Sequence, residues 1–388
     1  MNGYHLGRRA WVARSLVITI VLVVGAAATL IGRGPAVASG HRAAGPSVLT
    51  TRTSGGHDAL WLVSPAGGSP TAAGTLPGVA GSVAVSPDGA NVAYLPANGK
   101  PSIWLGYGAL APKTISLAPA GIRTTGGMTW TSADQLLVSG SASRRYYDLR
   151  KARLYTVDVR TGSVKAFRGL VGAEPSADAA SGKVAYVHFT RLDGGSASNG
   201  HTPLYRESLR LLNLNGSGAG RTLTWEQYRP MADQRAFSQP QLAPGGEWVL
   251  AGVTGSDVRV TYRLLDTSDI AMPWLTVFAP ALEAAAWAPA GGSVAFGGVV
   301  PSPGMLSDSC VYVDDVTSGA LTRTPAGVMP AASAGMITGV AWSDDGRIVA
   351  DTMDSGSGTV REHVLVMRGD DLGTVKDLGQ GHLSVWVP

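Results

Sequence analysis

Cysteine is almost absent from this sequence of 388 residues, because Cys310 is its only example, so no disulfide can form within the chain. Long apolar patterns with the 3.6-residue period of helices are also scarce, and 52 glycines and 23 prolines interrupt the chain throughout. We therefore expect an all-β protein held by packing and strand pairing. Cys310 lies in an alternating stretch, residues 309 to 316, which predicts a buried and unreactive thiol.

Acidic residues are missing from the first 38 positions, which contain four arginines, Arg8, Arg9, Arg14 and Arg33. The whole chain has 31 basic and 27 acidic residues, so residues 39 to 388 carry 27 of each and a net charge of zero. The excess basicity therefore belongs to the N-terminus. It gives no argument that the body of the protein binds nucleic acid, and we expect no nucleic-acid partner.

The arginines surround an uncharged apolar run of eighteen residues, 15 to 32, which follows a basic segment, 1 to 14. Two interpretations remain open. The run can be a single transmembrane helix with the N-terminus inside the cell, or the core of a secretory signal peptide that is cleaved after Ala38. Arg8 and Arg9 also loosely resemble a twin-arginine signal. Each interpretation predicts an extracytoplasmic protein, either tethered to the cell membrane or secreted, with a linker over 33 to 46.

The folded domain, 47 to 388, is organised around a repeated hairpin. Residues 82 to 95 read as a strand, a turn at Ser86-Pro87-Asp88-Gly89, and a second strand. Five further units of this kind begin at Gly127, Glu174, Pro240, Ala284 and Gly339. Their second strands start at intervals of 44 to 65 residues, and each is followed by a third alternating strand and a short fourth one. Four-stranded units at about this spacing are typical of a β-propeller.

A seventh unit is divided between the two ends of the domain. Residues 382 to 388, HLSVWVP, match only the opening strand of the repeat, and the segment from Val48 supplies the strands that should follow it. We therefore predict a seven-bladed β-propeller that is closed by pairing the C-terminal strand with the N-terminal strands.

The repeat resembles the TolB-type and WD40-like bacterial β-propellers, in which a strand ending in Ser-Pro-Asp-Gly opens each blade. Only residues 86 to 89 match this motif in full; the turns at 243 to 246, 288 to 291 and 343 to 346 match in part, and the Trp-Asp dipeptide of WD40 repeats is absent. The resemblance covers residues 47 to 388. It implies the propeller fold and leaves the function open.

Signatures of catalysis are lacking. No Gly-x-Ser-x-Gly elbow occurs, the seven histidines show no metal-binding spacing, and the glycine-rich segments have no phosphate-binding pattern. Paired acids at 314–315, 344–345 and 370–371 fit turns better than calcium sites. We expect no catalytic residue recognisable from the sequence, no metal and no cofactor.

Three long loops are instead rich in arginine and aromatic residues. They span 141–152, 190–207 and 224–239, and in an up-and-down propeller all three should emerge on one face, above the second to fourth blades. These residue types dominate binding hot spots. The predicted partner-binding residues are Arg144, Arg145, Tyr146, Tyr147, Arg150, Arg191, Arg206, Trp225, Tyr228, Arg229, Arg235 and Phe237.

The sequence thus predicts a non-enzymatic scaffold in the cell envelope that binds an envelope protein, a glycan or another ligand on its long-loop face. The alternative is a propeller enzyme, such as a lactonase, a lyase or a glycan-active enzyme, with acids and histidines from separate blades meeting at the central channel. A cluster of Asp, Glu and His at the channel mouth would favour the enzyme.

Overall fold

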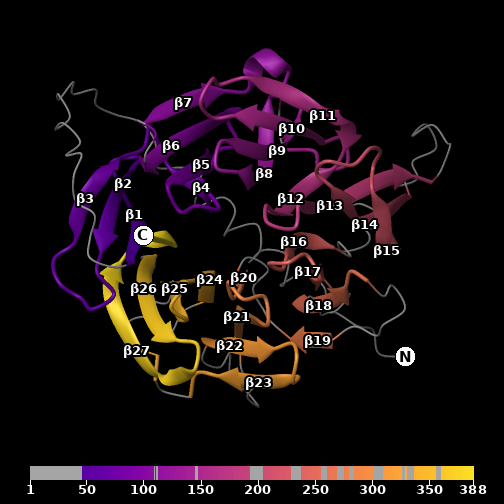
Figure 1. Ribbon diagram of the computed structural model, residues 1–388. Helices are drawn as coiled ribbons and strands as arrows, with labels where there is room; N and C mark the ends of the chain where they lie inside the picture. The colour runs from indigo at the N-terminus through magenta and orange to yellow at the C-terminus, as the bar shows by residue number, and fades with distance from the viewer. Residues whose placement is uncertain are drawn as a thin grey trace, which may run out of the picture.

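The computed structural model describes residues 46–388 except 109, 111, 145–146, 193–203, 229–236, 255–259, 269–274, 279–283, 300–308, 326–327, 330–335 and 355–359. These residues form seven four-stranded antiparallel sheets around a central axis (Figure 1). The predicted seven-bladed β-propeller is confirmed. The predicted hydrophobic helix at 15–32 lies outside the described residues, and within the described part of the chain no helix is long and apolar enough to cross a membrane.

Blades are numbered along the chain, and the strands of each blade are given from the innermost outwards. Blade 1 contains β28 (His382–Val387), β1 (Ser47–Ser54), β2 (His57–Val63) and β3 (Thr71–Thr75), and blade 2 contains β4 (Ala80–Val85), β5 (Asn91–Pro96), β6 (Ser102–Gly108) and β7 (Lys113–Ser116). A single turn of 3₁₀ helix, η1 (Ala118–Ala120), precedes blade 3, which contains β8 (Thr124–Ser132), β9 (Gln135–Ser141), β10 (Arg153–Asp158) and β11 (Val164–Val171). Blade 4 contains β12 (Ala173–Asp178), β13 (Lys183–Arg191), β14 (Tyr205–Asn213) and β15 (Arg221–Tyr228).

The remaining three blades follow the same order. Blade 5 contains β16 (Ser238–Leu242), β17 (Trp248–Thr254), β18 (Val260–Asp266) and β19 (Leu275–Phe278), and blade 6 contains β20 (Ala285–Trp287), β21 (Ser293–Val299), β22 (Ser309–Asp315) and β23 (Ala320–Arg323). Blade 7 contains β24 (Met336–Trp342), β25 (Arg347–Asp354), β26 (Arg361–Arg368) and β27 (Asp371–Gln380). Each of the six repeats found in the sequence therefore supplies the two inner strands of one blade.

The Ser-x-Asp-Gly turn between the two inner strands is stabilised by its own side chains. Ser86 Oγ accepts the backbone N–H of Asn91 at 2.9 Å and donates to Asp88 Oδ1 at 2.5 Å. Gly89 supplies the left-handed backbone of the turn, with φ 67°. Ser343 makes the equivalent bonds to Arg347 N and Asp345 Oδ1 in blade 7. The motif thus recurs because it satisfies the polar groups of a tight turn.

The ring is closed by strand addition between the two ends of the domain. The C-terminal strand β28 pairs antiparallel with β1, with Val48 opposite Trp386 and Leu49 opposite Val385. The innermost strand of blade 1 therefore comes from the far end of the chain, as the split repeat predicted. This pairing covers the inner edge of β1, and β28 takes the innermost position that β4, β8, β12, β16, β20 and β24 occupy in the other blades.

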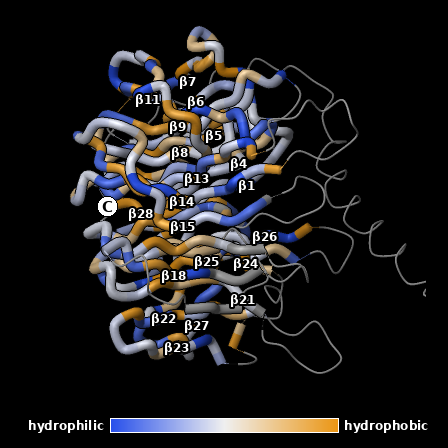
Figure 2. Tube along the Cα trace, turned by 90° about the vertical axis from the view of Figure 1, so that its right-hand side faces the viewer, coloured by the Kyte–Doolittle hydropathy of each residue, from blue (hydrophilic) through white to orange (hydrophobic). Residues whose placement is uncertain are grey.

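Alternate connections of each blade emerge on opposite faces of the disc. We call the side that carries the second-to-third strand connections and the links between blades the long-loop face. The opposite side, which carries the other turns, is the turn face. The C-terminus lies on the turn face, at the left of the edge-on view in Figure 2.

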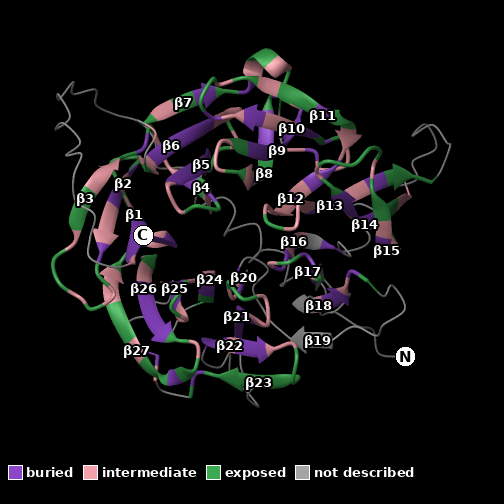
Figure 3. Ribbon diagram, in the orientation of Figure 1, coloured by how far each residue is buried: buried purple, intermediate pink, exposed green. Residues whose placement is uncertain are grey.

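The core lies between the blades, where apolar residues of the second and third strands pack face to face. Phe296, Tyr186 and Tyr94 are among the largest fully buried side chains. Outer strands such as β11, β23 and β27 are largely exposed, as Figure 3 shows. Cys310 is buried in β22, which confirms the predicted buried thiol.

Tryptophans at the ends of four inner strands join each blade to the one before it. The indole N–H of Trp130 donates to the carbonyl of Ala84 at 3.0 Å, and Trp342 donates to Ala286 at 3.0 Å. Trp287 and Trp386 make the same contact with Gln241 and Ala341. A tryptophan at this position of the repeat thus donates a hydrogen bond to the preceding blade and also packs in the core.

We expect Trp130→Phe to lower the free energy of unfolding by about 1–3 kcal/mol, because it leaves the Ala84 carbonyl without its donor while keeping an aromatic ring. Chemical denaturation measures this change. Trp225→Phe is the matched control, since Trp225 is 48% exposed and should change stability by less than about 0.5 kcal/mol. Equal effects of the two substitutions would contradict the structural role of the indole bond.

Candidate functional site

The long-loop face carries the longest connections of the propeller. The chain between β9 and β10 has 11 residues, that between β13 and β14 has 13, and that between β15 and β16 has 9. Two more connections on this face, 300–308 and 324–335, are equally long and were not predicted. On the turn face no connection exceeds eight residues among those bounded by described strands. With the split blade as blade 1, the three predicted loops belong to blades 3 to 5.

The two predicted loops of blade 4, 190–207 and 224–239, each include residues that belong to β-strands in the structure. Strand β14 already begins at Tyr205, which pairs with Arg191 on one side and Tyr228 on the other. Arg206 and Trp225 therefore lie in paired outer strands, because the ladder of blade 4 extends beyond the apolar core. This corrects the predicted loop boundaries and gives both side chains a fixed backbone.

Arg206 and Trp225 form the most exposed aromatic contact described on this side. The guanidinium carbon of Arg206 lies 4.5 Å from the centroid of the Trp225 ring. Stacking of this kind holds a guanidinium parallel to an indole by cation–π attraction. Both residues are exposed, so a charged group and a large apolar surface are presented together.

A second arginine–aromatic pair joins blade 3 to blade 4. Arg150 lies over the ring of Tyr205, 5.6 Å from its centroid, and its Nε donates to Asp148 Oδ1 at 3.0 Å. Asp148 is buried and also lies 3.9 Å from the exposed Lys151 ammonium. Tyr205 was absent from the predicted set, although it falls within the predicted loop. Its role depends on the register of β14, which the sequence pattern did not reveal.

The other predicted residues are placed differently. Arg144 and Arg191 are exposed, whereas Tyr147 is half-buried and donates through Oη to Ser139 Oγ at 2.9 Å. Phe237 is completely buried in the core between blades 4 and 5, so its ring lies inside the protein and not on the binding face. Arg145, Tyr146, Arg229 and Arg235 lie outside the described residues, as does the side chain of Tyr228.

The long-loop face has an excess of positive charge and several exposed hydrophobic side chains. On the long-loop face of blades 3 to 5 the described cationic side chains outnumber the described carboxylates, which are those of Asp148, Glu174, Glu207 and Glu226. The cationic group consists of Arg144, Arg150, Lys151, Arg153, Arg191, Arg206 and Arg263. Of the five large hydrophobic side chains that are exposed among the described residues, Leu321 alone lies towards the turn face. Leu192, Met336 and Val360 lie at the long-loop face, and Trp225 lies near it.

The inner strands begin, on the long-loop face, in irregular and partly strained backbone. Six of the seven inner strands have a β-bulge close to their first residue. Three bulges place a residue other than glycine at positive φ, namely Glu174 at 51°, Gln239 at 44° and Leu383 at 48°. Such a conformation costs about 1 kcal/mol or more. It turns the Glu174 carboxylate towards the next blade, where Oε2 accepts the Gln239 N–H at 2.7 Å.

A cluster of ionisable residues lies where blades 7, 1 and 2 meet. The two ring nitrogens of His382 each face a carboxylate, with Nε2 3.5 Å from Asp58 Oδ2 and Nδ1 2.9 Å from Glu362 Oε2. Asp58 is fully buried and accepts the Ala80 N–H at 2.8 Å. Asp351, also buried, accepts the Ser384 N–H at 2.8 Å. We call His382, Asp58, Glu362 and Asp351 the ring-closure cluster. Its contacts hold β28 against β2 of blade 1 and against β25 and β26 of blade 7.

Electrostatics indicate a structural role for His382 in this cluster. Burial alone lowers the pKa of His382, but its contacts with Asp58 and Glu362 outweigh burial and raise the pKa to about 10. At neutral pH the ring is therefore a fixed imidazolium whose single positive charge lies between the side chains of Asp58 and Glu362. This ring does not exchange its proton near pH 7, so it is poorly suited to general acid–base catalysis, whereas burial raises the pKa of Asp351 in the same cluster to about 6. Within the described residues, moreover, no three His, Cys, Asp or Glu side chains are arranged to hold a metal ion.

No protein-family profile matches the sequence, and no curated protein matches it either. Among solved structures, the chain is similar to the β-propeller domain of the Trilobed protease from Pyrococcus furiosus, with 12% identity over 87% of this chain and 93% of that chain, at a TM-score of 0.50. It is similar to oligogalacturonate lyase from Vibrio parahaemolyticus, with 12% identity over 82% and 85%, at a TM-score of 0.50.

The chain is also similar to TolB from Acinetobacter baumannii, with 14% identity over 88% of this chain and 83% of that chain, at a TM-score of 0.46. TolB proteins are thus among the similar structures, together with other β-propellers. At these identities the similarity shows the fold alone. The Pyrococcus domain is described as having an open velcro topology, whereas β28 closes the ring in this chain.

Proposed function

We propose that this protein is an exported propeller scaffold, tethered to the cell membrane, that binds a carboxylate-rich envelope protein or glycan on its long-loop face. The stacked and exposed Arg206–Trp225 pair is the observation that carries the proposal. Arginine supplies charge-assisted hydrogen bonds to carboxylates, and tryptophan supplies a large rigid contact area. The surplus of cationic side chains around the pair sets the sign of the partner.

The position at which strand β1 begins supports a tethered orientation. Strand β1 begins at Ser47 on the turn face, next to Val387 of the closing strand. The residues before Ser47 are therefore joined to the disc at the face opposite the long loops. If residues 15–32 anchor the chain, the turn face lies towards the membrane and the long-loop face points away from it, accessible to other envelope components.

The anchor is tested separately from the binding surface. Cell fractionation followed by N-terminal sequencing of the protein distinguishes an intact N-terminus in the membrane fraction from a chain that begins at Ser39. The first result supports the tether. A chain that begins at Ser39 and is recovered from the medium makes the scaffold a secreted one.

We expect the double variant Arg206→Ala and Trp225→Ala to weaken binding to the partner at least about tenfold, because both halves of the stacked pair are lost. Affinity purification of the full-length protein from envelope extracts, followed by quantitative mass spectrometry, measures the change. Arg221→Ala is the matched control, because Arg221 is an exposed arginine at the other end of the same strand, β15. An unchanged set of partners for the folded double variant would contradict the proposal.

A further inference from the structure

A depression on the turn face arises directly from the way the ring is closed. In six blades a turn joins the two inner strands, but in blade 1 the inner strand β28 ends at Val387 and the second strand β1 starts at Ser47. The missing turn leaves a hollow of about 750 Å³ between the turn of blade 2 and that of blade 7. Its lining includes Pro46 and Pro388, the residues on either side of the gap.

The walls of this depression are apolar and well fixed. They include Val85 of blade 2, Trp342 of blade 7, and Val385 and Trp386 of the closing strand. The two indoles are held in place by their hydrogen bonds to Ala286 and Ala341. Pro388 packs so closely on the turn of blade 2 that a Cβ added to Gly89 would lie 3.0 Å from its Cδ. The hollow is therefore a formed feature with a rigid boundary.

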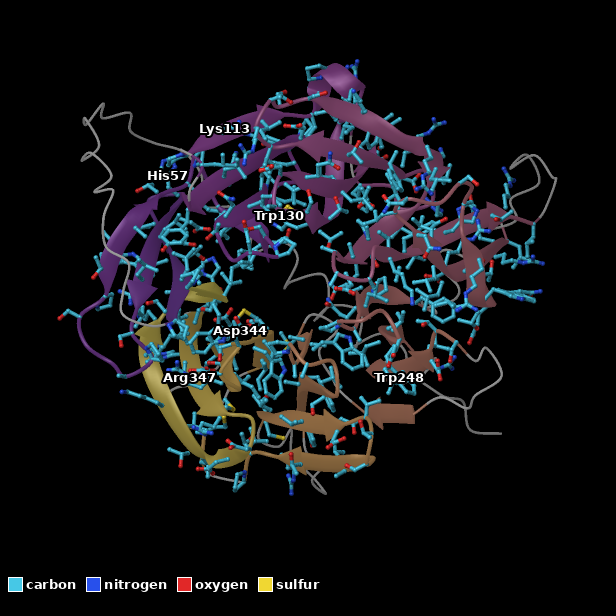
Figure 4. The ribbon with its side chains drawn as sticks, viewed as in Figure 1. His57, Lys113, Trp130, Trp248, Asp344 and Arg347 are labelled. Atoms are coloured by element: carbon cyan, nitrogen blue, oxygen red, sulfur yellow. The ribbon has the colours of Figure 1, made fainter. Side chains whose placement is uncertain are left out.

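The rim of the depression is acidic. Asp88 projects from the turn of blade 2, and Asp344 and Asp345 project from the turn of blade 7. A hydrogen bond from Ser86 keeps the pKa of Asp88 below its usual value, so this carboxylate stays ionised at neutral pH. Figure 4 shows Asp344 close to the centre of the ring, with Arg347 farther out in the same blade.

The protein itself shows how an arginine is held at this rim. The guanidinium carbon of Arg347 lies 5.1 Å from the centroid of the Trp386 ring, and its Nε donates to Asp345 Oδ1 at 3.0 Å. Aromatic stacking and carboxylate pairing are thus combined in one side chain. Asp88 and Asp344, on the two sides of the hollow, form no ion pair with any described residue.

We propose that the depression binds a cationic peptide segment, with an arginine or lysine side chain held between Asp88 and Asp344 and its apolar neighbours resting on Trp342 and Val385. Charge complementarity selects the occupant, because the rim is acidic and the walls are apolar. This site lies on the face opposite the partner-binding surface, so the two proposals stand independently.

Calorimetric titration of the full-length protein in detergent with the blocked peptide Ala-Arg-Pro-Ala-Arg-Ala tests the site. The same peptide with glutamine in place of both arginines is the comparison. We expect the double variant Asp88→Asn and Asp344→Asn to weaken binding of the arginine peptide at least about tenfold, since two unpaired carboxylates are lost. Asparagine keeps the hydrogen bonds of the turns, so folding should be unchanged.

Asp315→Asn is the matched control, because Asp315 is also a turn aspartate on the turn face but lies in blade 6, away from the hollow. It should leave the affinity within about twofold. Indole NMR signals locate the peptide: those of Trp342 and Trp386 should shift, while that of Trp225 should not. Equal binding of the glutamine peptide, undiminished binding by the double variant, or a shift confined to Trp225 would each overturn the proposal.

Discussion

Deletion of residues 382–388 is expected to abolish cooperative folding of the propeller, or to lower its melting temperature by more than about 10 °C. The deleted strand contributes three nearly buried apolar side chains, Val385, Trp386 and Val387. Burial of each stabilises the fold by about 1.5–3 kcal/mol. The loss therefore approaches the whole net stability of a typical domain, about 5–15 kcal/mol.

The deletion also opens the ring. Without β28, strand β1 becomes a free edge, and the indole contact between Trp386 and Ala341 is lost together with His382. Exposed inner edges favour aggregation by pairing with other chains. Differential scanning calorimetry together with size-exclusion chromatography measures both effects.

Removal of Pro388 alone is the control, because it leaves every residue of β28 in place. It should shift the melting temperature by no more than a few degrees, through loss of the contact with Gly89. A protein lacking residues 382–388 that melts like the intact chain would show that the ring does not depend on this closure.

Replacement of His382 by glutamine is expected to reduce the free energy of unfolding at neutral pH by about 3 kcal/mol, because Asp58 would remain as a buried carboxylate without its cation. Glutamine preserves some hydrogen bonding but carries no charge. His363→Gln is the matched control. His363 follows Glu362 directly in β26. Its Nδ1 lies 3.1 Å from Oδ2 of a single, partly exposed carboxylate, that of Asp377. The control should cost less than about 1 kcal/mol.

The pH dependence of this loss follows from the direction of each pKa shift. The pKa of His382 is raised to about 10, so its contribution to stability is complete below pH 6.5 and is lost as the pH rises towards 10. The stability difference between the wild type and His382→Gln should narrow over that range. Urea denaturation of both proteins at a series of pH values measures it, and a constant difference would contradict the assignment.

The pKa values of the two buried acids of the cluster, Asp351 and Asp58, are shifted in opposite directions, so the two residues affect the pH dependence of stability differently. Burial raises the pKa of Asp351 to about 6, so the wild type should lose stability as the pH rises from 3.8 to 6. Although burial opposes it, hydrogen bonding with His382, Thr53 and Ala80 lowers the pKa of Asp58 below 3.8, so this contribution is lost only in stronger acid. Asp351→Asn should therefore gain stability relative to the wild type between pH 4 and 6.

Much of the architecture could be predicted because a propeller repeats its local chemistry. A turn such as Ser86-Pro87-Asp88-Gly89 satisfies its own polar groups, so it appears in the sequence wherever the structure needs it. The split repeat at the two ends of the domain likewise predicted the pairing of β28 with β1, since a single strand lacks partners unless the ring closes.

The candidate site was predictable only in outline. The excess of arginine and aromatic residues on one face was visible, but the pairing of Arg206 with Trp225 depends on the register of β14 and β15. Phe237 was assigned to the surface by its position in a polar stretch, whereas the approach of blades 4 and 5 buries it completely. Hydrophobicity along the chain does not reveal which neighbour covers a residue.

The ring-closure cluster had no signal in the sequence at all. His382 meets Asp58, more than 300 positions away, and Glu362 of the neighbouring blade only because the closing strand brings them together. The sequence by itself determined the repeat, the turns and the split blade, because these depend on interactions between residues close in the chain. Only the tertiary structure decided which charges are buried together, which aromatic side chains remain exposed, and where the missing turn leaves a hollow, because these depend on contacts between blades.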